Sequence, residues 1–126
     1  MDFQKILVDT DVLIDFLRKQ ETARILLEKA SQAADLYLSV VTLAELLAGM
    51  RPSEEKATEG LIQGFSILQV NEKIARRAGA LRHHYKKVLL PDCLIAATAL
   101  EEDCLLLTGN RKDYPFDGIK FFIPVD

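Results

Sequence analysis

Four acidic residues of this sequence lie close to apolar segments that have the character of buried strands or closely packed helices. Asp9 directly follows the apolar run 6–8, and Glu45 follows the β-branched and aromatic segment 36–41. Asp92 opens a segment rich in small residues, and Asp113 follows the apolar run 104–107. In a parallel sheet, such positions lie at the edge where the strands have their carboxyl ends. We therefore expect these four carboxylates to lie close together.

Carboxylates that converge on one point favour a bound cation. Two unit charges about 4 Å apart repel by roughly 4 kcal/mol at an effective dielectric constant near 20, so the group must bind a cation or raise its pKa values. Oxygen ligands without histidine or cysteine favour Mg²⁺ or Mn²⁺ over zinc. Such an ion activates water and offsets the charge that develops on a phosphodiester during hydrolysis. The pattern thus indicates metal-dependent phosphodiester cleavage.

Each acid also has a purely structural explanation. Asp9 can cap a helix or form a turn, and Glu45 can complete a capping box that Thr42 opens. Asp92 can interact with a helix dipole, and Asp113 can be a solvated loop residue. Single positions therefore do not decide between structure and catalysis, whereas their joint placement does.

Apolar strands and amphipathic helices alternate along the chain and would position these acids. Predicted strands cover 6–8, 36–41, 66–70, 104–107 and 119–123, and predicted helices cover 11–17, 22–34, 42–49, 53–63, a segment capped by Asn71 that runs to 85, and a small-residue segment from 91. Because small side chains allow close packing, we expect the last helix to be central. The alternation predicts an α/β fold, a three-layer α/β/α sandwich around a mainly parallel, roughly five-stranded sheet.

Four short motifs resemble those of the PIN-domain family, in order and with similar spacing. They are 9–15 (DTDVLID), 42–46 (TLAEL), 92–99 (DCLIAATA) and 107–114 (LTGNRKDY). Any one of them would be a weak signal, but together they cover nearly the whole chain. The short length also resembles VapC-type toxins, the ribonuclease halves of toxin–antitoxin pairs.

The resemblance implies an endoribonuclease that uses Mg²⁺, with Mn²⁺ as the alternative. The acidic positions of the family, which would bind metal and carry catalysis, fall on Asp9, Glu45, Asp92 and Asp113. Supporting positions, which would hold a ligand in place, fall on Thr10, Thr108 and Asn110. Many family members carry an acid where this chain has Asn110, so we expect Asp113 to supply the fourth charge, directly or through water. The resemblance also implies an RNA substrate, a small antitoxin that places a basic side chain near the acids, and a homodimer.

Composition sets the broader limits. The 126 residues, 49% of them hydrophobic, fit a single domain over 1–126. We expect no membrane span, no secretory signal within 1–8, and a cytoplasmic protein with Cys93 and Cys104 as reduced, buried thiols. The net charge of −3 does not exclude an RNA partner, because a bound cation inverts the field of an acidic pocket.

Other functions fit parts of the pattern. Segment 9–12 also resembles the opening motif of haloacid-dehalogenase-type phosphatases, but that class needs a lysine near a later strand end, where this chain has 108–110. A receiver domain would need its phosphate-accepting aspartate where this chain has Asn71. An acidic pocket could also serve a non-catalytic binding module, although the intact set of acids favours catalysis. Arg111 and Lys112 fit contacts to RNA phosphates and a solvated loop about equally well.

Overall fold

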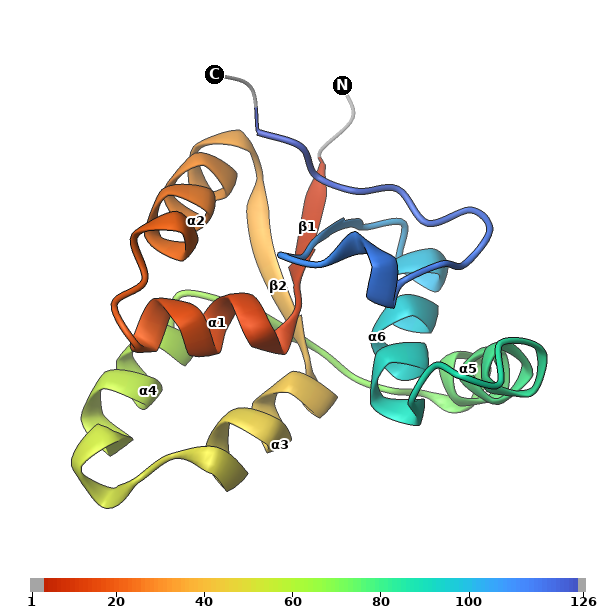
Figure 1. The fold of residues 1–126 in the computed structure, drawn as a ribbon, viewed down its shortest axis with the longest axis horizontal. Coiled ribbons are helices and arrows are strands. Elements are labelled where there is room, and N and C mark those ends of the chain that lie inside the picture. The colour runs from red at the N-terminus through yellow and green to blue at the C-terminus, as the bar shows by residue number, and fades with distance from the viewer. Residues whose placement is uncertain (1–3, 125–126) are drawn as a thin grey trace.

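Strands and helices alternate along the chain, and all strands of the sheet run parallel (Figure 1). The structure, a computed structural model, describes residues 4–124. Its elements are β1 (Lys5–Val8), α1 (Thr10–Leu17), α2 (Glu21–Ala33), β2 (Asp35–Ser39), α3 (Val40–Gly49), η1 (Pro52–Glu54), α4 (Glu55–Ile62), β3 (Ser66–Leu68), α5 (Glu72–His84), α6 (Leu90–Glu101), β4 (Leu105–Leu107) and η2 (Arg111–Asp113). The strand order is β3-β2-β1-β4.

The predicted three-layer fold is confirmed, with helices on both faces of the sheet (Figure 1). Side chains of a strand alternate between its faces, so Ile6 and Val8 pack with α1 and α2, while Leu7 packs with α5 and α6. The small-residue helix α6 is central, as predicted. Its residues Ala96 and Ala97 have no exposed surface, which lets the helix lie close to the sheet.

The sheet has four strands among the described residues, not the predicted five. Segment 119–123 lies beside β4 but makes only one isolated bridge, between Leu106 and Phe121. The Leu106 amide donates to the Lys120 carbonyl at 2.8 Å, and the Phe122 amide donates to the Leu106 carbonyl at 2.9 Å. Because β4 itself has only three residues, it offers this segment little to pair with, and no regular ladder forms.

The predicted start of α3 is also wrong. The strand β2 ends at Ser39, whose side chain accepts a hydrogen bond from the Val41 amide at 3.0 Å and caps a helix that begins at Val40. Thr42 therefore lies inside the helix and is fully buried. The local cap at Ser39 outweighs the strand preference of two β-branched valines.

Two other helix starts follow from side-chain caps. The Asp9 carboxylate accepts from the Val12 amide and starts α1. The Asn71 side chain accepts from the Ile74 amide at 2.9 Å, which confirms the predicted cap of α5. Within residues 4–124, none of these helices has the length and apolar character needed to cross a membrane. Residues 1–3, part of the segment in which we expected no secretory signal, lie outside the described residues.

Candidate active site

The site lies between the carboxyl ends of the neighbouring strands β1 and β4, at the topological switch point of the sheet. Parallel α/β sheets bind ligands at such a switch point. Asp9 follows β1 there, and its amide donates to the Leu107 carbonyl of β4 at 3.0 Å. Its carboxylate accepts from the Val12 amide at 3.1 Å through Oδ1 and from the Thr108 hydroxyl at 2.5 Å through Oδ2. Both oxygens are therefore fixed by chain segments about a hundred residues apart in sequence.

Burial makes Asp9 an unusual carboxyl group. Only 3% of the residue is exposed. The loss of hydration raises its pKa to about 6, and the negative charges of Asp11 and Asp92 add to the rise, against the opposing hydrogen bonds. A carboxylate that is costly to ionise alone becomes favourable beside a cation, which is the behaviour expected of a metal ligand.

A second group of polar side chains links α1 to α3. The Thr10 hydroxyl donates to Oε1 of Glu45 at 2.6 Å and lies 3.1 Å from the Thr42 hydroxyl. Thr10 and Thr42 are buried, whereas Glu45 is exposed. The buried hydroxyls thus hold one end of a carboxylate that faces solvent.

The third group joins α6 to the segment after β4. The Tyr114 hydroxyl lies 3.4 Å from Oδ1 of the half-buried Asp92. Burial raises the pKa of Asp92, and the charges of Asp113, Asp11 and Glu45 raise it further. Burial also raises the pKa of Tyr114, as do the nearby acids. Tyr114 therefore stays neutral and can act only as a hydrogen-bonding group.

The four predicted acids thus share one edge of the sheet, but they do not form a ready-made metal cage. The charges of Asp113 and Glu45 raise the pKa of Asp92, and the charge of Asp92 raises the pKa of Asp9. Across residues 4–124, however, no three acidic, histidine or cysteine side chains lie close enough together to hold an ion as they stand. Two of the carboxylates are instead hydrogen-bonded to threonine hydroxyls.

Comparison with known proteins identifies the family. The family model for the PIN domain matches residues 6–120. The chain belongs to the PIN-domain family. It is 41% identical to "Ribonuclease VapC10" of Mycobacterium tuberculosis, with 94% of this chain and 95% of that protein covered. It is 30% identical to "Ribonuclease VapC1" of Methanocaldococcus jannaschii, over 94% of this chain and 83% of that one. VapC-type ribonucleases are thus its relatives within the family.

Solved structures of similar proteins agree. A toxin–antitoxin complex from Klebsiella pneumoniae contains a chain 32% identical to this one, with a TM-score of 0.78 and coverage of 90% of this chain and 92% of that chain. VapBC-1 from nontypeable Haemophilus influenzae contains a chain 26% identical, with a TM-score of 0.77 and coverage of 94% and 97%. This membership sets aside the phosphatase and receiver-domain alternatives.

The predicted supporting positions of this PIN domain differ in what they do. Thr10 and Thr108 hold carboxylates directly. Asn110 acts through its backbone, because its amide donates to the Thr108 hydroxyl at 3.1 Å. That contact leaves the Thr108 proton free to point at Asp9. The neighbouring Arg111 guanidinium lies 5.9 Å from the centre of the Phe121 ring, so it packs against the last segment of the chain.

Three further residues belong to the site although sequence reasoning did not place them there. Thr42 is predicted from the sequence to open a capping box, and Asp11 enters the sequence prediction only as part of the motif 9–15. Tyr114 directly follows Asp113 within the fourth motif, but its burial against Asp92 has no signal in the sequence. The position of Asp11, two residues after Asp9 in the first turn of the helix that Asp9 caps, is the signal that could have indicated it.

The donor set fits a hard divalent cation. Every candidate ligand offers oxygen, as Mg²⁺ and Mn²⁺ prefer. Burial, together with the charges of nearby acids, raises the pKa values of Asp9 and Asp92, and a bound cation would offset both effects. Because Glu45 and Asp113 are exposed, rotation of their side chains or bridging water can complete the coordination.

The two cysteines do not take part. Cys93 and Cys104 are both free and buried, as predicted. Burial raises the pKa of both thiols, that of Cys104 to about 11. Neither is therefore activated as a nucleophile, since the thiolate is the reactive form.

Proposed function

We propose that the chain is a metal-dependent endoribonuclease, the toxin component of a toxin–antitoxin pair. The observation that carries the proposal is the placement of the buried Asp9 carboxylate between the ends of β1 and β4, within the field of Asp92 and Asp11. The names of the relatives, VapC-type ribonucleases, supply the reaction class.

In this proposal Asp9, Asp92, Glu45 and Asp113 hold Mg²⁺ or Mn²⁺. When bound, such an ion supplies Lewis-acid chemistry, which makes water a better nucleophile and neutralises charge on the phosphate. The four acids are also the candidate catalytic residues, because no histidine, serine or cysteine of the site is placed to act as a nucleophile.

The other residues of the site orient these carboxylates in advance. The Val12 amide and the Thr108 hydroxyl fix both oxygens of Asp9. The Thr10 hydroxyl fixes one oxygen of Glu45, which leaves the other free for a ligand. Groups that are already oriented need not reorganise during the reaction, which is a major source of catalytic power.

We further propose that a small antitoxin protein binds the chain and brings an arginine or lysine to the acids. The similar chain in the Klebsiella pneumoniae toxin–antitoxin complex supports a partner of this kind. We also propose that the protein forms a homodimer and acts in the cytoplasm, where RNA is its substrate. A pull-down of the chain from its native host and sedimentation of the purified protein test the two assemblies. Failure to co-purify a small protein, or a monomer at all concentrations, would count against them.

Cleavage of a circular single-stranded RNA tests the enzyme proposal directly, because only an endonuclease can open a circle. We expect linear product with Mg²⁺ or Mn²⁺, none with EDTA, and none with Asp9→Asn. Asp15→Asn, an exposed carboxylate on the same helix, is the matched control and should cut normally. Absence of cleavage under every metal, with several RNA sequences, would favour a binding module.

A further inference from the structure

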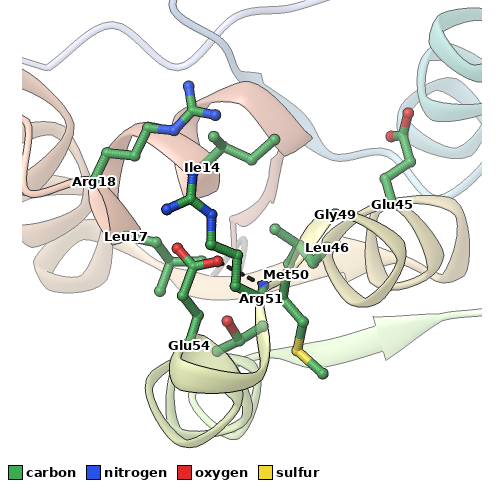
Figure 2. A pocket seen from close by; sticks show the side chains of 10 residues that line it. Ile14, Leu17, Arg18, Glu45, Leu46, Gly49, Met50, Arg51 and Glu54 are labelled. Atoms are coloured by element: carbon green, nitrogen blue, oxygen red, sulfur yellow. Dashed lines mark hydrogen bonds between the residues drawn. The ribbon is translucent and has the colours of Figure 1, made fainter.

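A cavity of about 320 Å³ opens beside Glu45 (Figure 2). Helix α1, the end of α3, η1 and α4 line it, and Leu17, Leu46 and Met50 supply the apolar part of this lining. Its volume lies at the lower end of the range for small-molecule sites, about 300–1,000 Å³. Glu45 is one of its lining residues, so the cavity shares this carboxylate with the candidate active site.

Two arginines line the same cavity. Figure 2 shows the guanidinium groups of Arg18, at the α1 C-cap, and Arg51, just before η1, on the same side of the view, with Glu45 on the opposite side. Among the described residues, neither guanidinium makes an ion pair. The nearby Glu54 is turned to the backbone, where its Oε1 accepts from the Arg51 amide at 2.7 Å. Two guanidinium groups that line one cavity and make no ion pair form a good site for a phosphate.

Thr58 of α4 gives a second, independent sign of a ligand. It lines the cavity and is only 1% exposed. Its hydroxyl is the one buried side-chain nitrogen or oxygen within residues 4–124 that has no hydrogen-bond partner. A buried polar group without a partner is costly. A ligand in the cavity with a hydroxyl, amide or carbonyl group would satisfy it.

We propose that this cavity is a subsite for one nucleotide of the RNA substrate, next to the bond that is cut. Arg18 and Arg51 bind its backbone phosphate, the apolar lining contacts its base or sugar, and the Thr58 hydroxyl bonds to one of their polar groups. The proposal rests on the proposed ribonuclease function. Such a subsite would contact the nucleotide next to the cleaved bond, so the identity of that nucleotide could influence where the RNA is cut.

Binding of a short, fluorescently labelled single-stranded RNA tests the subsite. The protein carries Asp9→Asn, so that the RNA stays intact, and Arg18→Gln with Arg51→Gln is compared with Arg24→Gln with Arg76→Gln. The control arginines are exposed and lie on α2 and α5, and their substitution removes the same charge as that of the cavity pair. We expect the double variant of Arg18 and Arg51 to bind the RNA roughly tenfold more weakly, and the control double variant to bind it like the parent protein. For the cavity variant, the slope of log K against log salt concentration should fall in magnitude by about 0.7, the value for one lost phosphate contact on a single strand.

Thr58 gives a second measurement that does not depend on charge. Thr58→Val keeps the shape but removes the hydroxyl, while Thr58→Ser retains it. We expect Thr58→Val to raise KM for RNA cleavage with little change in kcat, and Thr58→Ser to behave like the wild type. Circular dichroism and the melting temperature confirm that each variant is folded.

Several outcomes would overturn the subsite. Equal RNA binding by the two arginine pairs, with normal cleavage by the wild-type protein, refutes it and leaves the ribonuclease function intact. If the cavity pair binds RNA normally but loses the co-purifying antitoxin, the cavity holds a protein segment instead. If the wild-type protein never cleaves RNA, the proposed function itself fails, a result distinct from both.

Discussion

Replacing Asp9 by asparagine separates the catalytic role of this carboxylate from its effect on folding. Burial raises the pKa of Asp9 from the usual 3.8 to about 6. Because the folded protein binds the proton more tightly than the unfolded chain, the free energy of unfolding falls as pH rises from about 4 to 6 and is constant above that. This rise in the pKa of Asp9 lowers the free energy of unfolding at high pH by about 3 kcal/mol. In the absence of metal, Asp9→Asn should remove this destabilisation by the buried, ionised carboxylate at pH 8.

The asparagine can keep the hydrogen bonds of the native side chain. Its carbonyl oxygen accepts from the Val12 amide, and its amide group can donate to the Thr108 hydroxyl oxygen. We therefore expect Asp9→Asn to unfold at higher urea concentration than the wild type at pH 8, by up to about 3 kcal/mol in EDTA, and to lose that advantage near pH 4. The variant should nevertheless be inactive.

Urea unfolding in EDTA at pH 4 and pH 8 measures the effect, with Asp15→Asn as the control for loss of an exposed charge. Added Mg²⁺ should stabilise the wild type at pH 8 but not Asp9→Asn, because only the carboxylate gains from the cation. If Asp9→Asn were no more stable than the wild type at pH 8, or were equally stabilised by Mg²⁺, the reasoning about burial and charge would be refuted.

Three other variants test separate parts of the account. Thr108→Val removes the hydroxyl that lowers the pKa of Asp9, so the acidic limb of the pH–rate profile should move to higher pH and the rate should fall; an unchanged profile would contradict this. Thr58→Val removes an unsatisfied buried hydroxyl and should raise the free energy of unfolding by about 1 kcal/mol in urea titration, whereas a loss would show a hidden partner. Leu38→Ala, at a fully buried position of β2, should lower it by about 2–5 kcal/mol, and a loss below that range would show that the core collapses around it.

Features that depend on short-range patterns were predictable from the sequence. The run 6–8 before Asp9 predicted strand β1, and Asn71 predicted the start of α5, because a cap and its helix are neighbours in sequence. The four acids were placed at one edge because parallel strands have their carboxyl ends there. The prediction of where α3 starts was wrong because two local signals competed. Ser39 and Thr42 can both cap a helix; the Ser39 cap forms, and Thr42 packs against Thr10 from inside the helix.

Features that depend on long-range packing were not predictable. Tyr114 contacts Asp92 across 22 positions of sequence, and its burial follows from the way the segment after β4 folds back. The segment 119–123 has the composition of a strand, but its pairing depends on the length of β4. The cavity beside Glu45 combines Arg18, Arg51 and Thr58 from three elements, and no single motif contains them.

The central claim is that the acids at this edge of the sheet bind a catalytic divalent cation, and Mn²⁺ binding by isothermal titration calorimetry tests it most directly. The account predicts a saturable isotherm for the wild type over the same Mn²⁺ concentrations that activate RNA cleavage. It predicts strongly weakened binding for Asp9→Asn and Asp92→Asn, and unchanged binding for Asp15→Asn. Equal Mn²⁺ affinity in the wild type and Asp9→Asn, or RNA cleavage that persists in EDTA, would contradict the claim.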